Sequence, residues 1–159
     1  MSQPENIKKY LEKIGINFKT HRHLPVYTCE EAEKLCRGIK GIHSKNLLLK
    51  SKKTDNFYLA IIEHSKRLDI KAIGQKLGEK ISFASDNDLM ENLNIQPGSV
   101  SPFALINDKE GKIMILLDKD VNESEIVSFH PNINTETLEL SGKDFHRYLE
   151  SLKNKVVII

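Results

Sequence analysis

Tryptophan is absent from this chain of 159 residues, and cysteine occurs only twice. Cys29 and Cys36 fall in one expected helix and suit neither a disulfide framework nor a zinc site, so reduced thiols are the simplest interpretation. Long apolar runs are also missing, because the longest, such as residues 58–62, are far too short to span a membrane. The first residues contain no apolar signal core. We therefore expect a cytoplasmic protein with no membrane partner.

A strong excess of one charge is also lacking, since 24 basic and 22 acidic residues leave a net charge of +2. This balance does not predict strong nonspecific nucleic-acid binding. Basic side chains and histidines gather in residues 21–53, where they form either a local basic face or an ordinary solvated surface. Hydrophobic residues make up 39% and charged residues 29%, which is typical of a folded globular protein. The length predicts a single domain over residues 1–159.

Several motifs of known chemistry are missing from the sequence. It contains no G-x-S-x-G, no phosphate-binding Walker loop and no dinucleotide fingerprint. The pair His21-x-His23 is too closely spaced for the helical histidines of a zinc protease and lacks a third ligand. Neither cysteine has a base nearby in the sequence, so a thiol nucleophile is unsupported. We therefore expect no metal and no cofactor.

Apolar periodicity and capping residues predict a mixed α/β fold. Helices are expected over residues 6–14, after a Thr28–Glu31 capping box, from Asp69 to Gly78, from Ser85 or Asp86 to Leu93, and after Ser141. A strand or an extended stretch is expected over 16–24, and strands are expected over 46–50, 57–62, 81–84, 103–106, 113–117, 126–129 and 137–140. Two hairpins are expected, 46–62 and 103–117. The fold we expect is a mainly antiparallel mixed sheet of about six or seven strands wrapped by about four helices.

Lys45 begins the first apolar strand, between Ser44 and Asn46. A lysine at the mouth of a strand can present its ammonium group to a phosphate or to a polarised oxygen. The alternative is a solvated lysine at a strand edge, which is the common situation of this residue type.

The segment 97–102, with the sequence PGSVSP, is a second candidate. Gly98 can adopt a positive φ and lets a substrate approach the backbone, while Pro102 biases Ser101 towards extended geometry. The amides from Gly98 through Ser99 and Val100 to Ser101 can then converge and stabilise an oxyanion or hold a carbonyl. The alternative is an ordinary turn between a helix and a strand.

His130 precedes Pro131 at an expected strand end. It can orient a substrate, bind a water molecule or act as a base, or it can be a structural histidine with satisfied hydrogen bonds. Asn132, Asn134 and Thr135 follow, and they are either turn formers or polar lining of a pocket.

Five segments together resemble the YbaK/prolyl-tRNA synthetase-associated editing family. They are LPVYTCEEAEKL at 24–35, HSKNLLLKSKK at 43–53, LGEKISFAS at 77–85, LMENLNIQPGSVSPFALIND at 89–108 and FHPNINTETLELSGKDFHRYL at 129–149. The ordered set covers nearly the whole chain and is specific, although any one segment alone is weak. The subgroup it is most similar to is that of the free-standing ProX and PrdX proteins.

The resemblance implies hydrolysis of the ester between a mischarged amino acid and the 3′-terminal adenosine of the proline tRNA, with alanine as the expected amino acid. The family's lysine falls on Lys45, its G-x-x-x-P loop on Gly98–Pro102 and its pocket histidine on His130. Thr28 and Asn46 also match subgroup positions. The partners implied are the 3′ end of mischarged tRNA(Pro) and prolyl-tRNA synthetase.

A mechanism follows from what ester hydrolysis needs, which is a placed water, a stabilised oxyanion and a grip on the tRNA end. We assign the loop amides to the ester carbonyl, Lys45 to the terminal phosphate or hydroxyls, and His130 to the water or the pocket shape. The substrate's own ribose hydroxyl is the expected water activator, because no carboxylate base is evident. A small pocket, with Val100, Phe103 and Leu47 as candidate walls, would exclude proline by size.

Three other functions remain open from the sequence. One is a YbaK-type deacylase of cysteinyl-tRNA(Pro), another is a tRNA- or synthetase-binding module without catalysis, and the third is a metal-dependent hydrolase. The oligomeric state is open too, since residues 155–159 either join the protein's own core or pack against another chain.

Overall fold

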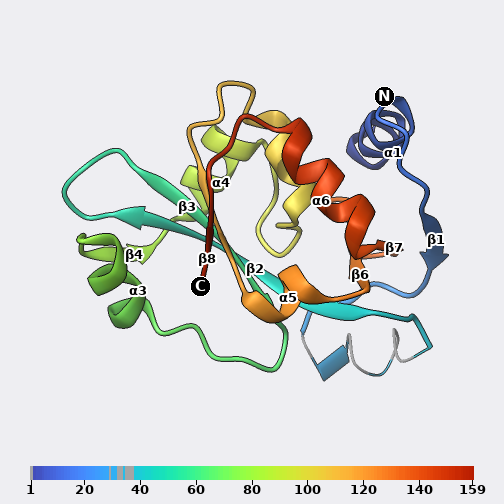
Figure 1. The fold of residues 1–159 in the computed structure, drawn as a ribbon, viewed down its shortest axis with the longest axis horizontal. Coiled ribbons are helices and arrows are strands. Elements are labelled where there is room, and N and C mark those ends of the chain that lie inside the picture. Colours follow the sequence, from blue (N-terminus) through green and yellow to red (C-terminus); the bar gives the residue numbers. More distant parts are fainter. Residues whose placement is uncertain (1, 29, 32–33, 35–37) are drawn as a thin grey trace.

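The computed structural model describes residues 2–28, 30–31, 34 and 38–159 (Figure 1). The described helices are α1 (Gln3–Lys13), α3 (Ile70–Leu77), α4 (Asp86–Leu93), the 3-10 helix η1 (Pro102–Asn107), α5 (Lys119–Glu123) and α6 (Gly142–Ser151). The strands are β1 (Lys19–Arg22), β2 (Ile42–Ser51), β3 (Phe57–Glu63), β4 (Ile81–Phe83), β5 (Met114–Leu117), β6 (Ile126–Phe129), β7 (Glu136–Ser141) and β8 (Val156–Ile158). Both cysteines lie outside the described residues.

The strands form one mixed sheet in the order β1-β7-β6-β2-β3-β5-β8, and β4 also pairs with β2. The β1/β7, β6/β7, β2/β3 and β2/β4 pairs are antiparallel, whereas β2/β6, β3/β5 and β5/β8 are parallel. The long β2–β3 hairpin crosses the middle of the molecule, with α3 and β4 beside its turn and α1 and α6 at the other side (Figure 1). Strand β2 therefore joins the β1-β7-β6 part of the sheet to the β3-β5-β8 part.

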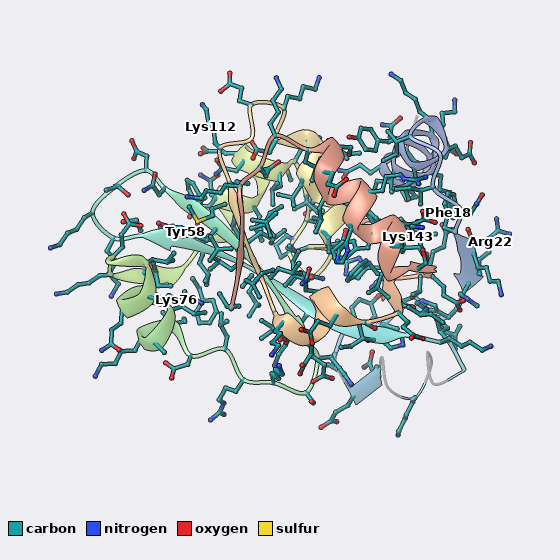
Figure 2. The ribbon with its side chains drawn as sticks, viewed as in Figure 1. Phe18, Arg22, Tyr58, Lys76, Lys112 and Lys143 are labelled. Carbon is teal, nitrogen blue, oxygen red and sulfur yellow. The ribbon has the colours of Figure 1, made fainter. Side chains whose placement is uncertain are left out.

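The central strand β3 is buried on both faces, which accounts for its continuous apolar run. Leu59 and Ile61 belong to the larger core, and Tyr58 and Ala60 belong to a smaller core beneath α3. The alternation follows from the pleat, which points successive side chains to opposite faces. Figure 2 shows side chains filling the space between sheet and helices, while cations such as Lys112 extend outward from the surface.

The predicted helix boundaries are confirmed where a local cap sets them. Asp69 accepts a hydrogen bond from the Ala72 N–H at the start of α3, and Gly78 ends that helix at φ 73°. At α4, Ser85 and Asp88 form a reciprocal capping box. Each of these caps joins residues three positions apart in the chain, so a short stretch of sequence is enough to predict it.

The predicted capping box near residue 28 is present in a modified form. The Thr28 hydroxyl accepts a hydrogen bond from the Glu31 N–H at 3.1 Å. The Glu31 carboxylate in turn accepts from the Tyr27 N–H at 2.9 Å, one residue before the position expected for a capping box. The remainder of the predicted helix falls partly outside the described residues.

The predicted hairpin over residues 103–117 is wrong. The apolar run from Phe103 to Ile106 belongs to η1, because Ser101 caps this helix through the Phe103 N–H and Pro102 occupies a first-turn position that suits proline. The strand after it, β5, pairs in parallel with β3 and β8. Four consecutive buried residues therefore belong to a tight helical turn, not to a strand.

The mixed α/β fold class is confirmed, although the described residues form a sheet of eight strands, more than the six or seven predicted. The additional strand is β8, whose Val156 pairs with Ile115 of β5, so the C-terminal segment joins the sheet of its own chain. The short helix α5 was also not predicted. Its N-cap is Asp118, whose side chain accepts a hydrogen bond from the Asp120 N–H.

Candidate functional site

A cavity of about 720 Å³ opens beside the first half of β2. This volume lies in the range of pockets that hold drug-sized ligands. Its described lining is His23, Val26, Tyr27, Thr28, Ile39, Gly41, His43, Ser44, Lys45, Asn46, Leu47, Leu48, His64, Phe83, Ala84, Asp86, Leu89, Pro97, Gly98, Val100, Ser128, Phe129, His130, Asn134 and Thr137. Segments far apart in the sequence therefore meet here, and six of the nine predicted site residues are among them.

Lys45 lies within β2, where it pairs with Ile62 of β3, and not at the strand's first residue as predicted. Its side chain is half-buried and lines the cavity. No carboxylate of the described residues lies within ion-pair distance of its ammonium group. A partly desolvated cation without such a partner is suited to an anionic or strongly polar ligand.

Asn46 connects this strand to the glycine-containing loop. Its side-chain amide donates a hydrogen bond to the Val100 carbonyl at 3.3 Å. Ser44 donates to the Asn46 amide oxygen at 3.0 Å, which fixes the orientation of the amide. Asn46, the neighbour of Lys45, therefore holds Val100 of the loop in place.

Only some residues of the loop from Gly98 to Pro102 belong to the described lining of the cavity. Gly98, at φ 84°, and Val100 line the cavity, whereas Ser99, Ser101 and Pro102 are not among the described lining residues. The Ser99 N–H already donates to the Gln96 carbonyl at 3.1 Å. The amides left for a substrate carbonyl are therefore those of Gly98 and Val100.

Ser101 supports the loop from behind. It is fully buried, and its hydroxyl accepts from the Phe103 N–H at 3.1 Å and donates to the Asn132 amide oxygen at 2.7 Å. Asn132 then donates to the Gln3 side chain at 2.8 Å, and Gln3 donates to the Asn94 carbonyl at 2.6 Å. This chain of hydrogen bonds links the loop to α1 and to the end of α4.

Asn132 is a turn former, as its position suggested, because it adopts φ 62°. Its second role, as the buried link between Ser101 and Gln3, was not predicted from the sequence. Nothing in a local window distinguishes it from neighbouring turn residues, since both partners are distant along the chain.

His130 follows β6 and lies against the same loop. A hydrogen bond with the Val100 backbone holds the ring, and its Nδ1 is buried without a hydrogen-bond partner among the described residues. Burial, together with repulsion from His23, lowers the pKa of His130 to about 4. The imidazole is therefore neutral at physiological pH. It is better suited to accept a hydrogen bond than to act as a general base.

We expect His130→Gln to weaken the pH dependence of stability between about pH 6.5 and pH 4. The pKa of this ring is 6.5 in an ordinary setting and about 4 in the fold. As the pH falls through this window, the unfolded chain takes up the proton before the folded one, so the free energy of unfolding decreases. The decrease should be at most about 3 kcal/mol.

Urea unfolding at pH 7, pH 5.5 and pH 4 measures this effect as a difference between the two proteins. The comparison must be with the wild type, because burial also lowers the pKa of His43 and acts in the same direction. Identical pH dependence of unfolding in wild type and His130→Gln would contradict the assigned environment of His130.

Three further histidines surround the cavity, and sequence reasoning did not place them there. The His23 Nδ1 donates to the Leu24 carbonyl at 2.9 Å, and its Nε2 lies 2.9 Å from the Thr137 hydroxyl. His43 and His64 meet edge to face, with ring centroids 6.3 Å apart. Within the described residues no group of three histidine, cysteine or carboxylate side chains is arranged to hold a metal ion.

One acidic residue, Asp86 at the first position of α4, occurs in the described lining, and it is exposed. Among the predicted wall residues, Val100 and Leu47 line the cavity, whereas Phe103 is fully buried in the core behind it. Thr28 also lines the cavity. The described lining thus combines one lysine, several histidines and an apolar wall.

Comparison with known proteins matches residues 23–148 to the aminoacyl-tRNA editing domain family. The chain belongs to this family. Removing an amino acid from tRNA is hydrolysis of a carboxylic ester, so the predicted class of enzyme, an aminoacyl-tRNA deacylase, is confirmed. The matched range contains every residue of the described cavity lining.

Two relatives illustrate how this editing domain is distributed. The prolyl-tRNA editing protein ProX of Acetoanaerobium sticklandii is 34% identical over 145 residues, which cover 91% of this chain and 88% of the relative. Prolyl-tRNA synthetase associated domain-containing protein 1 of Mus musculus is 30% identical over 158 residues, covering 96% and 93%.

The fold of the editing domain also agrees with solved structures. The crystal structure of a proposed trans-editing enzyme for prolyl tRNA synthetase superposes with a TM-score of 0.72 at 18% identity, covering 99% of this chain and 96% of the other. None of the described helices is long and apolar enough to cross a membrane.

Proposed function

We propose that the cavity hydrolyses the aminoacyl ester of mischarged tRNA(Pro), with alanine as the amino acid removed. The observation that carries the proposal is the meeting of Lys45, Gly98, Val100 and His130 around one cavity. The names of the relatives, a prolyl-tRNA editing protein and a prolyl-tRNA synthetase associated protein, support the choice of tRNA.

In the proposed reaction, a water oxygen attacks the ester carbonyl carbon and forms a tetrahedral intermediate. The amides of Gly98 and Val100 donate to the oxygen that becomes negative, which is the largest single contribution expected of such a site. The carbon–oxygen bond to the ribose then breaks, and the leaving oxygen takes up the proton that the attacking water has lost. The products are the free amino acid and tRNA with a free 3′ hydroxyl.

The side chains have separate parts in this reaction. Lys45 binds the terminal phosphate or the neighbouring ribose hydroxyls and fixes the ester in the cavity. His130, which is neutral and has a buried Nδ1 without a described hydrogen-bond partner, accepts a hydrogen bond from the water or from the substrate. The neighbouring ribose hydroxyl activates the water, since the one described acidic residue in the lining is exposed.

Selectivity for alanine over proline is proposed to come from the size of the aminoacyl subsite. Val100 and Leu47 are apolar residues of the lining and can form its wall. A wall that excludes a larger side chain discriminates more strongly than a pocket that must favour one extra methylene, which contributes about 1–3 kcal/mol.

The tRNA body is proposed to lie along the exposed basic side chains of the first third of the chain, or to be presented by prolyl-tRNA synthetase. Arg22, Lys34, Lys40, Lys52 and Lys53 are exposed there. Such contacts with phosphates weaken with salt, so ionic strength distinguishes binding by this face from binding through a protein partner.

A panel of aminoacylated substrates tests the function. Hydrolysis of alanyl- and cysteinyl-tRNA(Pro) should be measured with and without a metal chelator. The proposal predicts rapid loss of alanine that chelation does not change. Preferential loss of cysteine would show that cysteine, and not alanine, is the amino acid removed. Loss of activity in chelator would indicate a metal-dependent hydrolase. Binding without turnover would indicate a noncatalytic module.

A further inference from the structure

Two large aromatic side chains at the cavity are exposed to solvent. Phe83 is 55% exposed and Tyr27 is 79% exposed, yet both line the cavity that contains Lys45. Exposed aromatic rings grouped around one concave site are unusual on a surface without a ligand, because their burial is favourable. The position of these two rings therefore indicates a ligand with flat apolar faces.

Hydrogen bonds fix the backbone at each of these two residues. Phe83 is the last residue of β4, where it pairs with Leu49 of β2, and the next residue, Ala84, donates to the Leu48 carbonyl at 2.9 Å. On the Tyr27 side, Val26 donates to the Asn134 carbonyl at 3.0 Å, and the Tyr27 N–H is bound by the Glu31 carboxylate. Both rings are thus presented from fixed backbone positions.

The distance along β2 separates the part of the cavity near Lys45 from the part near the Phe83 ring. Lys45 and the partner of Phe83, Leu49, are four residues apart on one strand, which corresponds to roughly 13 Å. An ester held near Lys45 therefore leaves room for the ribose and base of the same nucleotide before the Phe83 ring is reached. The cavity volume of about 720 Å³ is also far larger than one small amino acid requires.

We propose that Phe83 and Tyr27 are stacking faces for the unpaired bases at the 3′ end of the tRNA. This inference rests on the proposed function, because the ester near Lys45 sets where those bases lie. A cation and exposed aromatic rings in one cavity form the combination by which proteins bind single-stranded nucleic acid. Stacking accepts any base, so it adds affinity for the common tRNA end and leaves amino-acid choice to the inner pocket.

An RNA hairpin that copies the acceptor stem, with 2-aminopurine as its unpaired terminal base, tests the inference without catalysis. Stacking on an aromatic ring quenches 2-aminopurine fluorescence, so titration with the protein reports both affinity and stacking. Phe83→Ala and Tyr27→Ala should each raise the Kd by about 5- to 100-fold and reduce the quenching. Phe83→Tyr should retain both, because the ring is kept.

Met90→Ala is the matched control, since Met90 is 40% exposed on α4 and is not in the described lining of the cavity. It should bind the hairpin like the wild type. Wild-type affinity and quenching in both Phe83→Ala and Tyr27→Ala would overturn the inference, as would a wild-type protein that does not quench the probe. Ring-dependent quenching in a protein that hydrolyses no aminoacyl-tRNA would support stacking and refute the proposed function.

Discussion

Replacing Lys45 with alanine is expected to lower kcat/KM for aminoacyl-tRNA(Pro) hydrolysis by about 100- to 1000-fold, the loss typical of a missing group that binds charge in a transition state. The half-buried ammonium lines the cavity, and no described carboxylate competes for it. Its removal takes away the positive charge that fixes the substrate end. Single-turnover release of labelled amino acid measures the effect.

Lys50→Ala is the control for this variant. Lys50 is on the same strand and is also partly exposed, but it pairs with Asp88 at 3.2 Å and is not among the described lining residues of the cavity. Hydrolysis by this variant should stay close to that of the wild type. Equal activity of Lys45→Ala and the wild type would show that Lys45 is a surface lysine without a part in the reaction.

Phe103→Ala is expected to reduce the free energy of unfolding by about 3–5 kcal/mol. Phe103 is fully buried, and its ring meets those of Phe129 and Tyr148 edge to face at 5.8 Å and 5.3 Å. Truncation leaves a cavity between these rings, directly after the Gly98–Pro102 loop. Urea unfolding followed by circular dichroism is the suitable measurement, because the chain has no tryptophan.

Phe83→Ala provides the same chemical change at an exposed ring and should alter stability by no more than about 0.5 kcal/mol. This small effect also establishes that the variant is folded when its RNA binding is measured. Similar unfolding midpoints for Phe103→Ala and the wild type would contradict the packing described around η1.

Local chemistry explains which parts of the fold were predictable. The starts of α3, α4 and α6 followed from Asp69, Ser85 and Ser141, whose caps involve residues only a few positions away. The parallel pairing of β8 with β5 was not predictable, because it joins segments about forty residues apart through backbone groups that carry no sequence signal. For the misassigned run after Ser101, the serine followed by Pro102 was the overlooked sign of a helix start.

The candidate site was predictable where a residue's own chemistry suggested a function. Lys45, Asn46, Gly98, Val100, His130 and Thr28 meet at one cavity, and their roles in the reaction remain predictions. The linking role of Asn132 and the positions of the other cavity histidines were missed, since both depend on partners that only folding brings near. Phe83 was missed for the opposite reason, because an aromatic residue at a strand end normally indicates core.

The most direct test of the central claim is the rate of ester hydrolysis on one tRNA(Pro) that carries alanine in one sample and proline in the other. The same enzyme concentration and salt should be used for both, so that only the aminoacyl group differs. The proposed editing site predicts rapid release of alanine with prolyl-tRNA(Pro) left intact. Equal release of the two amino acids, or release of neither, would contradict it.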